Sequence, residues 1–146
     1  MKSKIQKFGF FLLVCYTLLL SFWMFFGFGR YTYSEFRYNL IPFSTIRIFL
    51  NFDHFNTNMW VINLIGNIGV FVPFGILVPI VLQRRIVRSY ITFIIGIFVL
   101  ELIQLLSRRG SFDIDDLLLN SIGFVIGYGI YKIIVLWLNS NNSGAI

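Results

Sequence analysis

The sequence predicts an all-α membrane protein in which four helices cross the bilayer and a shorter segment lies in the interface or re-enters the membrane. Of its 146 residues, 58% are hydrophobic and only 12% are charged, whereas soluble domains carry about 25% charged residues. Four apolar stretches are long enough to cross about 30 Å of hydrocarbon, which takes roughly 20 helical residues. We find no internal repeat and no separate soluble domain, so residues 1–146 form a single membrane domain.

The four predicted membrane-spanning helices cover residues 8–28, 59–82, 89–106 and 117–138. Lysines precede the first helix, as they do in a secretory signal. Its apolar run is too long for a signal, however, and no small-residue cleavage site follows. We therefore expect this helix to remain in place as a signal anchor. The connection over residues 83–88 is short, which makes the second and third helices antiparallel neighbours.

The charged residues predict the orientation of these helices. With both termini in the cytoplasm, seven Lys and Arg residues lie inside and five lie outside, which is the asymmetry that the positive-inside rule favours. All six acidic residues then fall outside the membrane or near the outer end of a helix. The net charge is +6, but the basic residues flank apolar runs instead of forming a patch on a soluble face. Membrane lipid with anionic headgroups is therefore the expected partner, and nucleic acid is not.

The first outer loop, roughly residues 29–58, is not plainly hydrophilic. It contains the segment Asn39-Leu40-Ile41-Pro42-Phe43, and a second short apolar run follows at residues 48–50. These runs are too short to cross the membrane. The loop is therefore expected to lie in the outer interface or to dip into the bilayer.

Two asparagines share one face of the second predicted helix. Asn63 and Asn67 are four residues apart, and Gly66 beside them makes this face thin. Pro73 follows and is expected to kink the helix. These residues either line a polar site, or they serve only to hydrogen-bond a neighbouring helix and to shape the bundle.

The third predicted helix carries an acidic residue inside the membrane. Glu101 lies three residues before Gln104 and seven before Arg108, so all three share a face. Glu101 is about 7 Å below the outer end of the helix. A carboxylate at this depth is costly unless it is paired or lines a wet cavity. Glu101 is therefore either a functional residue or one half of a structural ion pair with Arg108 or Arg109.

Three aspartates lead into the fourth predicted helix. Asp115 and Asp116 lie at its N-terminus, where acidic side chains favour the helix dipole and can cap open N–H groups. Together with Asp113 and Glu101 they supply oxygen ligands of the kind that hard divalent cations prefer. Their spacing is not that of a calcium-binding loop, however, so we predict no metal site.

The fourth predicted helix then presents Asn120, Gly123 and Gly127 along one face. The glycine pair is spaced for close helix packing and lets another backbone approach. Asn67, Glu101 and Asn120 lie at similar depths near the outer ends of their helices. We therefore predict that these side chains converge on one polar pocket that opens outward.

With these residues established, the sequence resembles the VanZ-like family, small membrane proteins associated with resistance to teicoplanin-type glycopeptide antibiotics. The resemblance covers about residues 39–132. The matching residues, in order, are Asn39-Leu40-Ile41-Pro42-Phe43, Asn63, Gly66-Asn67, Phe71-Val72-Pro73-Phe74-Gly75, Glu101, Gln104, Arg109, Phe112-Asp113-Ile114-Asp115-Asp116, Asn120, Gly123 and Gly127. Arg109 is favoured over Arg108 as the match to the family's arginine. The resemblance implies a role in the cell envelope of a bacterium, at the plasma membrane, but it does not define a reaction.

The favoured function is binding without catalysis. The pocket would hold a lipid-linked or lipid-tailed molecule, such as a wall precursor or a lipoglycopeptide antibiotic, and so contribute to glycopeptide resistance. Arg109 would meet a phosphate or carboxylate group of this ligand. The predicted ligand-binding residues are Asn63, Asn67, Glu101, Gln104, Arg109, Asp113, Asp116 and Asn120. We expect no cofactor.

Two other functions remain open. The protein is an acid–base enzyme acting on a lipid or sugar if Glu101 works with Asp113, Asp115 or Asp116. A Ser/His/Asp set is not available, because the only histidine, His54, lies in a different outer loop. The protein is alternatively a small transporter or flippase, but four helices enclose little path, so this function would require a homo-oligomer.

Overall fold

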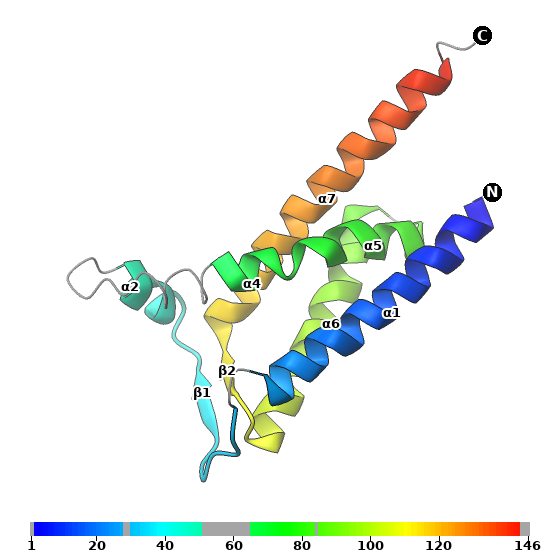
Figure 1. Ribbon diagram of the computed structural model, residues 1–146. Coiled ribbons are helices and arrows are strands. Elements are labelled where there is room, and N and C mark those ends of the chain that lie inside the picture. Colours follow the sequence, from blue (N-terminus) through cyan, green and yellow to red (C-terminus); the bar gives the residue numbers. More distant parts are fainter. Residues whose placement is uncertain (1, 28–29, 51–64, 84, 144–146) are drawn as a thin grey trace.

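The protein is mostly helical (Figure 1), and its computed structural model describes residues 2–27, 30–50, 65–83 and 85–143. Its elements, in chain order, are α1 (Lys2–Phe26), β1 (Arg37–Asn39), α2 (Ser44–Leu50), α4 (Gly66–Gly69), α5 (Val72–Leu82), α6 (Ile86–Ser107), β2 (Ser111–Asp113) and α7 (Ile114–Ser143). Within the described residues, three helices are long and apolar enough to cross a membrane, namely α1, α6 and α7. The described chain is therefore mostly helical and contains three candidate membrane-spanning helices.

Three of the four predicted spans agree with these long helices. Helices α6 and α7 extend a few residues beyond both predicted ends, whereas α1 begins six residues earlier and ends two residues earlier than predicted. The second predicted span differs. Its described part is a shorter apolar helical segment, Gly66–Leu82, and residues 59–64 of the prediction, Asn63 included, lie outside the described residues.

The kink predicted near Pro73 takes the form of a break between two helices. Helix α4 ends at Gly69, and Val70 and Phe71 form a turn before α5 begins. Pro73 then lies in the first turn of α5. Proline suits this position, because its missing N–H would have no partner in a first turn, whereas inside a continuous helix it would break a hydrogen bond.

Glycines allow the α4–α5 segment to pack directly on α7. A Cβ atom at Gly123 would collide with the carbonyl oxygen of Ile68, and one at Gly127 would collide with that of Val72. On the opposite side, a Cβ atom at Gly75 would meet backbone atoms of α7. The packing role predicted for Gly123 and Gly127 is therefore confirmed.

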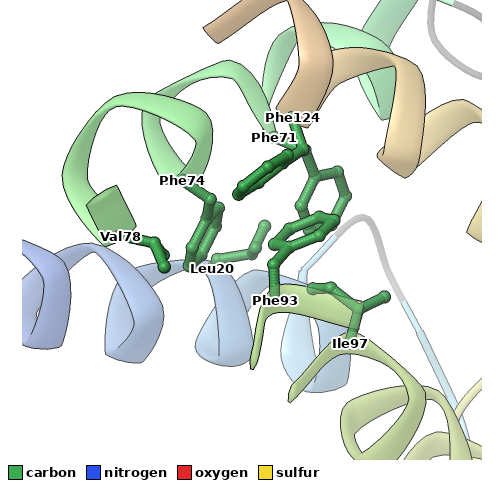
Figure 2. Close-up of a cluster of buried hydrophobic side chains, with 7 residues drawn as sticks. All are labelled: Leu20, Phe71, Phe74, Val78, Phe93, Ile97 and Phe124. Carbon is green, nitrogen blue, oxygen red and sulfur yellow. The ribbon is translucent and has the colours of Figure 1, made fainter. Parts of the chain in front are cut away.

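The hydrophobic core consists largely of phenylalanines contributed by several helices (Figure 2). Its buried members are Leu20, Phe71, Phe74, Val78, Phe93, Ile97 and Phe124. At its centre, Phe93 of α6 stacks on Phe124 of α7 with the ring centroids 4.6 Å apart. This stack joins α6 to α7, and the remaining rings join both helices to α5 and to the turn before it.

A short parallel pair of strands was not predicted. Strands β1 and β2 pair in register, with Arg37 opposite Ser111 and Asn39 opposite Asp113. They lie at the end of the bundle away from the two termini (Figure 1). Each strand has only three residues, too few for the alternating pattern by which strands are predicted. The all-α prediction holds for the bundle, and this pair attaches the loop after α1 to the start of α7.

Candidate functional site

A cavity of about 610 Å³ lies among α1, α4, α6 and α7. This volume falls in the range of small-molecule sites. Its apolar lining comes from α1 and from residues in and beside α4, namely Leu20, Trp23, Met24, Ile65, Val70 and Phe71. Its polar lining comes mainly from α6 and α7 and comprises Arg30, Asn67, Glu101, Gln104, Asp116 and Asn120. One side of the cavity therefore suits hydrocarbon and the other suits a polar group.

Glu101 faces this cavity without the arginine partner that was considered for it. Its side chain is buried, and the Oε2 atom has no hydrogen-bond partner among the described residues. Arg108 instead donates to the carbonyl oxygen of Ser34 at 3.1 Å, and Arg109 donates to that of Phe25 at 3.4 Å. The structural ion pair considered between Glu101 and Arg108 or Arg109 is therefore not formed.

Asn120 presents a second unpartnered acceptor. Its side chain is only 1% exposed, and the Oδ1 atom has no hydrogen-bond partner within the described part of the chain. A buried polar atom without a partner costs about 1–3 kcal/mol. Asn120 on α7 and Glu101 on α6 both line the cavity, so a ligand that donates hydrogen bonds there would recover this cost.

The amide side chains in the cavity also hold the helices together. The Nδ2 atom of Asn67 donates to Oδ1 of Asp116 at 2.5 Å, which joins α4 to α7. The Nε2 atom of Gln104 donates to the carbonyl oxygen of Met24 at 2.7 Å, which joins α6 to the end of α1. Both amides therefore already donate within the protein.

Arg30 is the basic residue of the cavity, and the sequence did not identify it. Its guanidinium group donates to the carbonyl oxygen of Arg109 at 3.3 Å, and its charge acts on both Glu101 and Asp116. Arg109, the predicted anion contact, is not in the cavity lining, and its guanidinium group lies over the Phe26 ring at 4.7 Å. Both arginines follow the outer end of a predicted span, so position alone could not distinguish them.

Asp115 caps a helix other than its own. Its carboxylate accepts hydrogen bonds from the backbone N–H groups of Phe43, Thr45 and Ile46 at 2.6, 2.9 and 3.1 Å. These N–H groups belong to the start of α2, which has no intrahelical acceptor for them. Asp115 therefore attaches α2 to the beginning of α7.

Asp113 completes this attachment. Its carboxylate accepts hydrogen bonds from the Thr45 hydroxyl at 2.6 Å, from the Asn39 amide at 3.3 Å and from the backbone N–H of Asp115 at 2.8 Å. The last bond makes Asp113 the N-cap of α7. Asp113 was predicted to bind ligand, but the structure places it in this network, and the cavity lining does not include it.

The structure thus brings five of the eight predicted site residues together around one cavity. These five are Asn67, Glu101, Gln104, Asp116 and Asn120. The sequence predicted that polar side chains from different helices would converge in this way. Arg109 and Asp113 lie outside the cavity lining, and Asn63 is outside the described residues. Among the residues that the structure describes, no group of three or more His, Cys, Asp and Glu side chains could hold a metal ion.

Comparison with known protein families identifies the family of this chain. The model of the VanZ/LLP1 family matches residues 8–136, which include most of α1 and extend beyond the range in which the sequence motifs were found. No curated protein and no solved structure matches the chain. Because the family match covers nearly the whole chain, this protein belongs to the VanZ/LLP1 family.

Proposed function

We propose that this protein binds the polar head of a lipid-linked or lipid-tailed molecule in the cavity and thereby contributes to glycopeptide resistance in the bacterial cell envelope. The observation that carries this proposal is the division of the cavity lining. The face from α1 and α4 is mainly apolar, whereas the face from α6 and α7 presents carboxyl and amide groups. An amphiphile has the same division. The resistance role itself is the one that the family name implies.

The apolar side of the cavity is continuous with the surface of the bundle. Trp23 and Ile65 line the cavity and are also 48% and 51% exposed. The exposed surface of a membrane-spanning bundle faces acyl chains. A ligand could therefore keep its tail in the lipid, along Trp23 and Ile65, while its head meets Glu101 and Asn120.

The proposed location is the plasma membrane, with four crossings and both termini in the cytoplasm. The two termini lie at one end of the bundle, and β1 and β2 lie at the other (Figure 1). The cavity is lined by the ends of α1 and α6 and by the start of α7, so this orientation places it toward the outer leaflet. The exposed apolar side chains of Leu40 and Ile41 are proposed to lie in the outer interface.

Cysteine labelling tests the orientation. In a Cys15→Ser background, a cysteine at Ser111 should react with a membrane-impermeant maleimide in intact cells, because β2 would face outward. A cysteine at Gln83 should react only after the cells are permeabilised, because it follows α5 at the end near the termini. Both positions are exposed, so accessibility in the folded protein is matched. Labelling of position 83 in intact cells would contradict the proposed orientation and indicate the opposite one.

A cavity-filling variant tests binding. Gly66 lines the cavity, and a Cβ atom there would meet nothing within 4 Å, so Gly66→Leu should occupy part of the cavity without disturbing the packing. We expect it to lower the affinity for a lipid-tailed ligand by at least tenfold at an unchanged unfolding temperature. Gly96→Leu is the matched control, because Gly96 also has open space around it but does not line the cavity. Equal ligand affinity in the two variants would argue against the cavity as the site.

Acid–base catalysis is the second candidate, because Glu101 and Asp116 reach the same cavity from different helices. Two carboxyl groups that flank one ligand can act as acid and base. Mass spectrometry of a lipid-tailed molecule recovered after incubation with the protein separates the two functions. An unchanged molecule supports binding alone, whereas a cleaved one that is absent with Glu101→Gln supports catalysis.

A further inference from the structure

The unpartnered atoms of the cavity indicate what the ligand head must supply. Oδ1 of Asn120 is a hydrogen-bond acceptor, and so is Oε2 of Glu101 when this carboxyl group is ionised. They lie on side chains that are only 4% and 1% exposed, so bulk water does not satisfy them. By contrast, the amide groups of Asn67 and Gln104 already donate to acceptors within the protein. Among the described residues, the site therefore lacks hydrogen-bond donors for these two oxygen atoms.

The charges around the cavity favour a cationic donor. Two carboxyl groups, those of Glu101 and Asp116, line it together with one guanidinium group, that of Arg30. Asp113 lies outside the lining, but its charge also acts on both carboxyl groups. An anionic head would meet at least two carboxyl groups for each guanidinium group. A carboxylate buried away from water is costly unless an opposite charge accompanies it.

We infer that the cavity receives a primary ammonium group carried on an apolar tail, with Glu101 and Asn120 as its hydrogen-bond acceptors. An ammonium group has three N–H donors and one positive charge, so it meets both requirements at once. This inference rests on the proposed binding function and specifies the ligand class. The group can belong to an aminolipid of the membrane or to an amphiphilic amine from outside, since the two share this chemistry.

Three probes with equal tails test the inference on the full chain in phosphatidylcholine nanodiscs. They are dodecylamine, dodecyl maltoside and dodecyl phosphate, which present an ammonium group, hydroxyl groups and an anion. The choline head of the surrounding lipid has no N–H donor and so does not satisfy the two acceptors. Binding is followed by the fluorescence of Trp23, which lines the cavity, and Trp23→Phe identifies the signal that comes from this residue.

We expect dodecylamine to bind at least tenfold more tightly than either other probe. Glu101→Gln should reduce its affinity by about tenfold and change that of dodecyl maltoside less than twofold. Glu35→Gln is the matched control, because it removes the same charge from an exposed position outside the cavity. Arg30→Gln should have the opposite effect and tighten dodecylamine binding. This variant keeps the test decisive if Glu101→Gln does not fold.

The outcomes separate this inference from the proposed function. Tightest binding by dodecyl phosphate, lost with Arg30→Gln, would overturn the ammonium assignment while leaving amphiphile binding in place. Tightest binding by dodecyl maltoside with no effect of Glu101→Gln would do the same. Equal losses with Glu35→Gln and Glu101→Gln would show attraction to the protein as a whole and would also overturn the assignment. If no probe binds, the proposed function fails as well.

A second experiment identifies the source of the amine. The dodecylamine titration is repeated in nanodiscs that contain phosphatidylethanolamine. Weaker dodecylamine binding there would indicate competition from a membrane aminolipid, and unchanged binding would indicate an external amine.

Discussion

Replacing Gly127 with leucine should leave almost no folded protein. A Cβ atom at this position would overlap the carbonyl oxygen of Val72 and would also approach the Cα atom of Gly75. Backbone atoms cannot change rotamer to make room, so α5 and α7 would have to separate and the core between them would open. We expect a loss of at least about 3 kcal/mol in the free energy of unfolding. The measurement is the monodisperse fraction and the unfolding temperature of the protein purified in mild detergent.

Gly129→Leu is the control for this change. Gly129 lies two residues further along α7, it is exposed, and a Cβ atom there would meet nothing within 4 Å. The new side chain should extend into lipid and alter the free energy of unfolding by no more than about 0.5 kcal/mol. If the two leucine variants unfolded at the same temperature, α5 and α7 would not be in backbone contact.

Replacing Asp115 with alanine should release α2 from α7. Three backbone N–H groups, from Phe43, Thr45 and Ile46, would lose their acceptor. A hydrogen bond to a charged group contributes about 1.5–3 kcal/mol, so the local loss should be roughly 3–5 kcal/mol even after α2 rearranges. Hydrogen exchange of these three amides should then be faster by about a hundredfold or more.

Asp115→Asn provides the graded comparison, because it keeps one acceptor oxygen at the same position. Its effect on exchange should be intermediate. The amides of α6 serve as an internal reference and should not change in either variant, because α6 does not contribute to this network. Native exchange rates at Phe43 and Thr45 in the alanine variant would show that Asp115 is not the cap of α2.

Much of the bundle was predictable because its signals are local. The three long apolar runs predicted α1, α6 and α7, and the spacing of Gly123 and Gly127 predicted a close helix contact. Pro73 predicted a kink in this part of the chain, because a residue without a backbone N–H cannot make the hydrogen bond of a continuous helix. The convergence of Asn67, Glu101 and Asn120 followed from their similar depths in the membrane.

The contacts of Asp113 and Asp115 were not predictable, because they join residues that are distant in the sequence. Asp113 and Asp115 bind a segment about 70 residues earlier in the chain, whereas Asp116 faces the cavity. Consecutive residues on a helix point about 100° apart, but the sequence does not show which direction meets which partner. The same reason explains why Arg30 was overlooked. The position of Arg30 in the cavity depends on where the chain after α1 lies relative to α6. No local sequence pattern predicts that position.

The glycine contacts also determine which parts of the cavity can change shape. Peptide groups of the α4–α5 segment and α7 touch directly. No side chain lies between them at these contacts, so the distance between the two parts cannot change by a change of rotamer. Helix α1, by contrast, is held by side-chain hydrogen bonds, such as that from the Tyr16 hydroxyl to the carbonyl oxygen of Val70 at 2.8 Å and that from Gln104 to Met24. Side chains such as these change rotamer at a cost of a few kcal/mol or less. The wall that carries Asn67, Asp116 and Asn120 is thus fixed by backbone contact, whereas the wall from α1 is held by side chains, which adjust more readily.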